Sequence, residues 1–308
     1  MNDFENDVLE GLGRKIKSLP SKYFYDSEGS RIFQEIMDMP EYYLPRAEME
    51  IIHNQSEQIS QKLRQQELDV IELGAGDGRK MVHFLRVLSR HVRSLTYFPL
   101  DISESILREN EKLIKGQVPD IQISPLVGDY FQTLQQIRER EIPRVILFAG
   151  SNIGNFPDSR ALVFLEMVKR EMKSGDCFLL GVDLKKHPKM IWDAYSDPHG
   201  ITARFNLNLL KRINRELDAD FEVSAFDHFA TYHPLTGAAE SFLVSLKKQK
   251  VNIRGKEFEF QPNEVIQTEI SQKYDEEKLM ELAQSSGLTW DSSYSDSQSL
   301  FSWVLFKR

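Results

Sequence analysis

Residues 68–78 read LDVIELGAGDG, a short apolar run that ends among three glycines. The run is typical of a buried strand, and the glycines let the backbone turn tightly without a Cβ in the way. Residues 80–92 then space their apolar side chains as an amphipathic helix does. The sequence therefore predicts a strand, a tight turn and a helix in succession.

The alternation of strands and helices continues to residue 185. Helical patterns at 103–114, 130–140 and 161–172 separate expected strands at 95–101, 121–129, 144–150 and 177–184. Parallel strands need crossover connections of this length, whereas antiparallel neighbours can be joined by short turns. We therefore expect an α/β fold whose mostly parallel, Rossmann-like sheet carries helices on both faces.

After residue 185 the pattern changes to α+β. A helical pattern at 201–217 precedes several strand-like stretches, which indicates a lobe inserted into the α/β fold. A closing helix at 275–287 and a hairpin after it are expected to extend the parallel sheet. We expect the core to comprise residues 57–185 and 276–308, and the substrate-binding lobe residues 1–56 and 186–275.

Within the first part of the lobe, Ser30 is a candidate N-cap for a helix from Arg31 to Met37. Pro40 lies just beyond the expected end of this helix. A second helix is expected to begin near Pro45, since proline is tolerated in a first turn.

Composition limits the possible functions. The 308 residues include 39 Lys and Arg against 47 Asp and Glu, a formal net charge of −8, which argues against binding to nucleic acid. The single cysteine, Cys177, allows no intramolecular disulfide, and we expect a cytoplasmic protein. No apolar run approaches the roughly 20 residues that span a bilayer, and the seven histidines follow no compact ligand spacing. We therefore expect no membrane association and no metal.

Carboxylates mark the strand ends around the glycine turn. Asp101 ends the second expected strand, where it can accept hydrogen bonds from both ribose hydroxyls, and Asp129 ends the third. A dinucleotide site would have G-x-G-x-x-G and bind a pyrophosphate, whereas this chain has G-x-G-x-G with Glu72 and Asp77 beside it. These carboxylates repel a pyrophosphate but suit the ammonium and sulfonium charges of S-adenosylmethionine. The pattern favours that ligand; a purely structural turn, with Asp101 as a helix cap, is the alternative.

The fourth expected strand leads into GSNIGNF, residues 150–156. A methyl acceptor bound beyond this strand end would meet Gly150 and Asn155, and an asparagine side chain both donates and accepts hydrogen bonds. A turn that caps the following helix explains the same residues without a ligand.

Eight segments together carry a family resemblance. They are KYFYDSEGSRIF, MPEYYLPRAE, ELGAGDG, PLDIS, GDY, GSNIGNF, DAYSDPHGITARFNLNLLKRINREL and QTEISQKY. In this order, and over nearly the whole chain, they resemble the histidine-specific S-adenosylmethionine methyltransferase family. The resemblance implies a class I methyltransferase core and Nα-methylation of L-histidine up to trimethylhistidine (hercynine), a step of ergothioneine biosynthesis. The cofactor would be S-adenosyl-L-methionine, converted to S-adenosyl-L-homocysteine, and the partner a small amino acid.

The resemblance also implies roles for individual residues. Tyr25 and Gly150 would lie beside the reacting centre. The histidine pocket would be lined by Tyr42, Asn155, Tyr195, Glu269 and Ser271. Cofactor contacts would come from Gly74, Gly76, Asp101, Asp129 and Tyr130.

Glu269 and Ser271 are two residues apart on an expected strand and therefore face the same side. A carboxylate that accepts from one imidazole nitrogen and a hydroxyl that meets the other would select histidine over an apolar ring. The alternative is a solvated strand face, with Tyr42 and Tyr195 as ordinary core aromatics. Ser241 stands where the histidine-specific relatives have a larger methionine, which leaves the exact substrate open.

Other functions remain possible on the sequence alone. A related methyltransferase could act on another amino acid or an indole compound, and a protein could bind S-adenosylmethionine without catalysis. A nucleic-acid methyltransferase is disfavoured by the acidic charge. We expect a monomer, and the sequence does not fix the number of methyl groups transferred.

Overall fold

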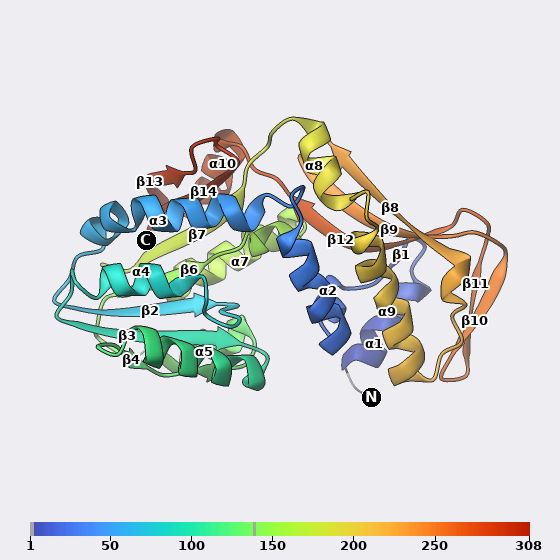
Figure 1. The fold of residues 1–308 in the computed structure, drawn as a ribbon, viewed down its shortest axis with the longest axis horizontal. Helices are drawn as coiled ribbons and strands as arrows, with labels where there is room; N and C mark the ends of the chain where they lie inside the picture. Colours follow the sequence, from blue (N-terminus) through green and yellow to red (C-terminus); the bar gives the residue numbers. More distant parts are fainter. Residues whose placement is uncertain (1–2, 138–139) are drawn as a thin grey trace. The chain divides into compact units, whose positions relative to one another are not determined.

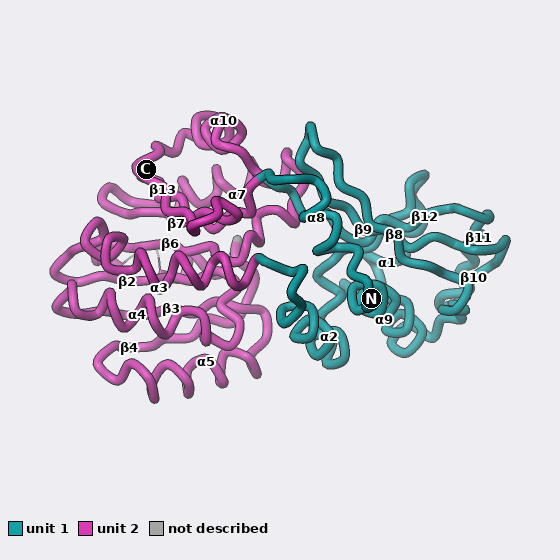
Figure 2. The backbone as a smooth tube through the Cα atoms, turned by 45° about the horizontal axis from the view of Figure 1, so that its top comes forward, with its two compact units in different colours: residues 1–43, 185–273 teal, residues 44–184, 274–308 magenta. Residues whose placement is uncertain are grey.

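The computed structural model describes residues 3–137 and 140–308. The chain forms two compact units, coloured separately in Figure 2. Unit 1 comprises the N-terminal segment to Tyr43 together with Lys185–Lys273, and unit 2 comprises Leu44–Leu184 and Tyr274–Arg308. No helix in the described ranges is long and apolar enough to cross a membrane.

Unit 2 is built on one twisted sheet of eight strands. Its order is β13-β14-β7-β6-β2-β3-β4, with β5 also paired to β3. All pairs are parallel except β14, which runs antiparallel to both β7 and β13. The strands are β2 (Glu67–Leu73), β3 (Ser94–Asp101), β4 (Gln122–Ile123), β5 (Leu126–Val127), β6 (Arg144–Phe148), β7 (Cys177–Asp183), β13 (Thr289–Ser295) and β14 (Phe301–Lys307). The parallel sheet and the closing hairpin are as predicted.

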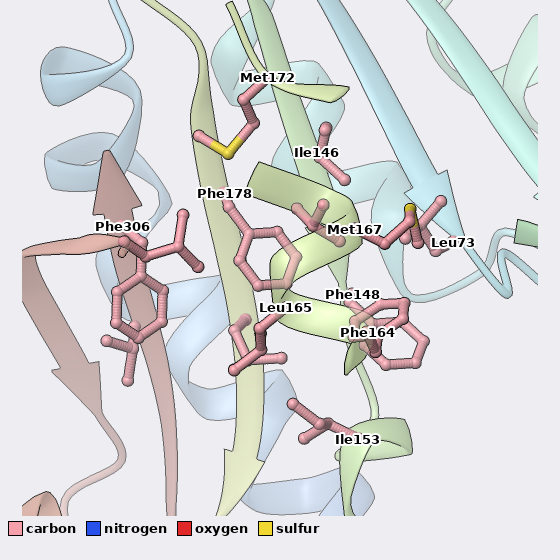
Figure 3. Packing of buried hydrophobic residues seen from close by; sticks show 14 of the residues in the cluster. Leu73, Ile146, Phe148, Ile153, Phe164, Leu165, Met167, Met172, Phe178 and Phe306 are labelled. Carbon is pink, nitrogen blue, oxygen red and sulfur yellow. The ribbon is translucent and has the colours of Figure 1, made fainter. Parts of the chain in front are cut away.

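Helices cover both faces of this sheet (Figure 1). Residue-by-residue alternation along the strands places Val70 in one core with Phe84, and Ile71 in the other with Phe164. The first core lies under α3 (Leu44–Lys62), α4 (Met81–Leu88) and α5 (Glu104–Gln117), and the second under α7 (Asp158–Glu171) and α10 (Glu276–Ser286). Figure 3 shows the second core, where the rings of Phe148 and Phe164 lie 4.7 Å apart.

The third expected strand and the helix after it are shorter than predicted. Pro125 has no N–H to donate to a neighbouring strand, and it separates β4 from β5. The helix expected over 130–140 is α6 (Tyr130–Thr133) followed by a 3-10 turn, η2 (Leu134–Ile137). Residues 138–139 of that prediction lie outside the described residues.

Helix α3 belongs to unit 2, although we expected residues up to 56 to lie in the lobe. Its apolar side chains Ile51, Ile52 and Ile59 are completely buried in the same core as Phe84 of α4. The unit boundary therefore falls between Tyr43 and Leu44.

Unit 1 has a four-stranded sheet in the order β1-β12-β9-β8 and a separate hairpin, β10-β11. The strands are β1 (Lys17–Ser18), β8 (Phe226–His233), β9 (Ala238–Ser245), β10 (Gln249–Ile253), β11 (Lys256–Phe260) and β12 (Val265–Gln272). The helical segments are α1 (Asp3–Gly13), η1 (Ser21–Phe24), α2 (Ser27–Asp38), α8 (Pro188–Tyr195), α9 (Ile201–Leu217) and η4 (Val223–Ala225). Phe205 and Leu209 of α9 pack in one core with Leu243 and Ile266 of the sheet.

Asp26, not Ser30, caps helix α2. Its Oδ1 accepts from Gly29 N at 2.7 Å, and the same carboxylate accepts from Asn208 Nδ2 at 2.8 Å and Arg215 at 2.6 Å. Because these two residues lie on α9, the cap also ties α2 to that helix. The helix consequently begins four residues earlier than Arg31.

Candidate active site

The glycine turn after β2 is shaped by left-handed backbone. Gly74, Gly76 and Gly78 have φ of +71°, +54° and +77°, values that side-chain-bearing residues rarely adopt. The N–H groups of Gly74 and Ala75 donate to Leu100 O at 2.8 and 3.0 Å, which fixes the turn against β3. A Cβ added at Gly76 would meet no atom of the described residues within 4 Å, so open space adjoins the turn at this point.

Five predicted cofactor residues lie in this turn or beside it. The Asp101 carboxylate, at the end of β3, accepts from Gly76 N at 3.2 Å and from Ser103 N at 3.0 Å. A Cβ on Gly74 would lie 3.0 Å from the Tyr130 hydroxyl. Burial raises the pKa of Tyr130 to about 12, and the charges of Asp101 and Asp129 add to the shift. The structure thus brings together Gly74, Gly76, Asp101, Asp129 and Tyr130.

Glu72 behaves differently from the charged group we expected. It is buried on β2 and accepts a short hydrogen bond from the Tyr97 hydroxyl. Burial raises its pKa to about 8, although the Tyr97 hydrogen bond and the charge of Lys80 act in the opposite direction. At neutral pH the carboxyl is therefore mostly protonated, and a cation placed beside it would lower this pKa.

Gly150 follows β6 with φ of +71°. Its N–H donates to Glu48 Oε1 at 2.8 Å, and the same oxygen accepts from Trp303 Nε1 at 2.9 Å. Lys80 Nζ donates to the other Glu48 oxygen at 2.5 Å. This almost fully buried carboxylate from α3 therefore fixes the backbone at Gly150.

Sequence reasoning missed Glu48, yet its position carried a signal. It stands three and four residues before Ile51 and Ile52, on the apolar face of α3. An acidic side chain on a buried face needs partners, because an isolated buried charge is very unfavourable.

Asn155 ends the short turn η3 (Asn152–Asn155), where it is half-buried. Asn152, at the start of the same turn, lies nearer the glycine turn: its Nδ2 is 3.5 Å from the position of a Cβ on Gly74. Ser151, with φ of +57°, accepts from Asp183 N through its Oγ at 2.9 Å. The end of β6 is thus held against the end of β7.

In unit 1, Glu269 and Ser271 lie on β12 opposite Ser241 and Ala239 of β9. Burial raises the pKa of Glu269 to about 7; the charge of Lys273 and a long 3.5 Å hydrogen bond from Ser241 Oγ act in the opposite direction. Ser271 is only 5% exposed. Ser271 is therefore not on a solvated strand face, and Glu269 is half-buried.

Ser271 belongs to a triangle of hydrogen bonds. Tyr195 Oη, from the end of α8, donates to Ser271 Oγ at 2.8 Å. Lys273 Nζ donates to both, at 2.7 Å to Tyr195 Oη and 2.8 Å to Ser271 Oγ. Lys273 is completely buried and was not singled out from the sequence, although it continues the alternation of Glu269 and Ser271 on one side of the strand.

A row of aromatic contacts connects the remaining predicted residues of unit 1. The ring of Tyr42 lies edge-on to Tyr195 at 6.2 Å and to Phe33 at 6.4 Å. Phe33 in turn lies 5.3 Å from Tyr25, whose side chain is half-exposed beside Phe205. Contacts in unit 1 thus link Tyr25, Tyr42, Tyr195 and Ser271, and Glu269 lies two residues before Ser271 on β12.

The strand order of unit 2, its antiparallel strand β14 and the glycine turn after β2 define the class of the protein as a class I S-adenosylmethionine-dependent methyltransferase. The residues fit that cofactor: the turn has open space beside Gly76 and a carboxylate at the end of β3.

Residues 4–308 match the family of histidine-specific, S-adenosylmethionine-dependent methyltransferases, and the chain belongs to it. The family predicted from the sequence is confirmed, and with it the enzyme class and the cofactor.

Curated relatives cover most of the chain. A Histidine N-alpha-methyltransferase of Mycobacterium tuberculosis is 38% identical over 87% of this chain and 83% of its own length. One of Mycolicibacterium smegmatis is 34% identical over 90% and 87%, respectively. A 4-dimethylallyltryptophan N-methyltransferase of Arthroderma benhamiae is 28% identical over 91% and 86%.

Proposed function

We propose that this protein methylates the α-amino nitrogen of L-histidine, up to trimethylhistidine (hercynine). The family and the two mycobacterial relatives support this substrate. The observation that carries the proposal is the pair of polar groups on β12: Ser271 is buried and hydrogen-bonded to Tyr195, and Glu269 is half-buried with its pKa raised to about 7. A carboxylate and a hydroxyl two residues apart match the two nitrogens of an imidazole.

In this proposal unit 2 binds the cofactor. S-adenosylmethionine supplies a methyl group on a positively charged sulfur. Asp101 accepts hydrogen bonds from the ribose hydroxyls, and Asp129 accepts one from the adenine amino group. Tyr130 packs beside Gly74. Gly74 and Gly76 let the ligand approach the backbone, and Gly150, fixed by Glu48, adjoins the reacting centre.

The histidine is held by polar side chains in the same proposal. Glu269 accepts from one ring N–H and Ser271 meets the other nitrogen, while Tyr42 assists at the ring. Asn155 binds at the α-carboxylate, and Tyr195, whose hydroxyl proton goes to Ser271, accepts from the amino end. A substrate with an apolar ring would leave the Glu269 carboxylate unpaired in a closed pocket, at a cost of several kcal/mol.

The amine must be unprotonated to attack, because an ammonium nitrogen has no lone pair. Tyr25, half-exposed at the end of the aromatic row, is the candidate to relay that proton. Most of the acceleration would come from orientation of the amine rather than from a strong base. Small groups near Gly150 would leave room for successive methyl groups.

The test is mass spectrometry of L-histidine incubated with the protein and S-adenosylmethionine. We expect mass gains of one, two and three methyl groups, and no product from L-tryptophan or 4-dimethylallyltryptophan. Glu269→Leu, similar in size but unable to accept a hydrogen bond, should lose histidine turnover. Methylation of an indole substrate in preference to histidine would refute the proposal.

Two observations make an indole compound the alternative substrate to test. The Arthroderma benhamiae relative is named for an indole substrate, and Ser241, opposite Glu269, takes the position at which the family resemblance implies a methionine in histidine-specific members. Ser241 is completely buried and donates to Glu269, which favours a polar ring here. We further propose a monomer in the cytoplasm, to be checked by light scattering and by fractionation of the source cells.

A further inference from the structure

Lys273 contacts two residues of the imidazole pocket proposed above but has no role in it so far. Its Nζ is completely buried, 2.7 Å from Tyr195 Oη and 2.8 Å from Ser271 Oγ, and lies 4.5 Å from the centre of the Tyr195 ring. An ammonium group has three donors and no acceptor. Both hydroxyl oxygens must therefore accept from it.

With the Tyr195 hydroxyl as the donor to Ser271, the direction of every hydrogen bond at Ser271 follows. Its Oγ accepts from Lys273 and also from the Tyr195 hydroxyl. A hydroxyl oxygen has two lone pairs and one proton. With both lone pairs used, Ser271 can offer a ligand only its proton.

We propose, on the basis of the proposed function, that Lys273 makes Ser271 an obligatory donor, so that the pocket binds the neutral imidazole of histidine and rejects the imidazolium ion. The ring nitrogen at Ser271 must be an acceptor, since a protonated nitrogen there would face another donor. The second nitrogen then carries the ring's only N–H and donates it to ionised Glu269. Lys273 is thus a positioning residue that selects one protonation state and one tautomer.

The charges around the pocket agree with this selection. The positive charge of Lys273 favours the ionised form of Glu269 and disfavours a second cation. Titratable groups on the strands that flank β12 are engaged elsewhere: Glu240 of β9 accepts from Gln267 Nε2 at 2.7 Å, and Lys17 of β1 pairs with Glu264.

From the packed helices, Tyr195 of α8 faces the pocket, while Lys189 and Asp193 of α8 pair with each other at 2.7 Å. Asn206 of α9 is neutral and accepts from Thr268 Oγ1 at 2.6 Å. These contacts account for Glu240, Lys17, Lys189 and Asp193, while the charges of Glu269 and Lys273 act on each other.

The direct test is ¹⁵N NMR of ring-labelled histidine bound to the wild-type protein with S-adenosylhomocysteine at pH 6. Free imidazole, with a pKa near 6.5, is about three-quarters protonated at that pH. We expect bound histidine to give one protonated and one unprotonated ring nitrogen. Two protonated ring nitrogens would overturn the inference, whereas failure to bind or methylate histidine at any pH would instead refute the proposed function.

Two variants separate the hydrogen bonds of Lys273 from its bulk. In the wild type, the dissociation constant of histidine should fall more than fourfold between pH 6 and pH 8, because the ring must lose its proton. Lys273→Gln keeps two N–H donors and should still bind histidine more tightly at pH 8 than at pH 6; loss of the positive charge raises the pKa of Glu269 and moves the gain in affinity to higher pH. Lys273→Met lets Ser271 accept, so it should flatten the profile and admit the imidazolium; an unchanged profile in a variant that still binds S-adenosylhomocysteine would count against the role of Lys273.

Discussion

Replacement of Glu72 by glutamine should remove much of the pH dependence of the stability of unit 2. The folded-state pKa of Glu72 is about 8, against an ordinary value of 4.5, because the carboxyl is buried beside Tyr97. The native state therefore holds a proton that the unfolded chain loses. The stability from this group is fully present below pH 4.5 and is lost as the pH rises towards 8.

The size of the effect follows from the shift. One pKa unit corresponds to about 1.4 kcal/mol, so the free energy of unfolding should fall by about 3–4 kcal/mol from pH 5 to pH 8 through Glu72. Glutamine is neutral throughout and can still hydrogen-bond to Tyr97. We therefore expect Glu72→Gln to match the wild type at pH 5 and to exceed it by about 3–4 kcal/mol at pH 8.

Urea unfolding at several pH values measures this difference. In a Trp192→Phe background the remaining tryptophans, Trp290 and Trp303, report on unit 2, where the Trp303 ring is buried against Phe84 at 5.4 Å. Glu269 in unit 1 titrates in the same range, so the informative quantity is variant minus wild type. Glu109→Gln, at an exposed site on α5, is the matched control. A difference that stays constant from pH 5 to pH 8 would show that Glu72 is ionised in the folded protein at neutral pH and refute the reasoning.

Three other substitutions test separate parts of the protein. Asp101→Ala should weaken S-adenosylhomocysteine binding by roughly 10- to 100-fold in calorimetry, since hydrogen bonds to a charged group contribute about 1.5–3 kcal/mol. Unchanged affinity would show that Asp101 does not bind the cofactor. Glu48→Ala should lower the free energy of unfolding by about 2–6 kcal/mol, because it leaves the N–H groups of Gly150 and Trp303 without their acceptor. A loss below about 1 kcal/mol in urea unfolding would contradict this. Glu269→Gln should raise the KM for histidine by roughly 10-fold or more while kcat changes less, and a change confined to kcat in steady-state kinetics would argue against a role in ring binding.

The site residues differ in how far local sequence could specify them. The glycine turn and the carboxylates at strand ends were recognisable because parallel strands bring their carboxyl ends to one edge. The pair on β12 followed from alternation along a strand. Lys273 and Glu48 were missed because their polar atoms are explained only by partners far along the chain, 78 residues away at Tyr195 and 102 at Gly150.

The sequence by itself determined the α/β core, the closing hairpin and the family, because periodicity, glycine positions and motif order are local properties of the chain. Only the tertiary structure decided that α3 packs in unit 2, that Asn208 and Arg215 of α9 share the Asp26 carboxylate, and that burial raises the pKa of Glu72 to about 8. Each of these depends on which distant groups exclude water from a residue or share its hydrogen bonds. Burial and partner choice arise from the folded packing, so no window of neighbouring residues contains them.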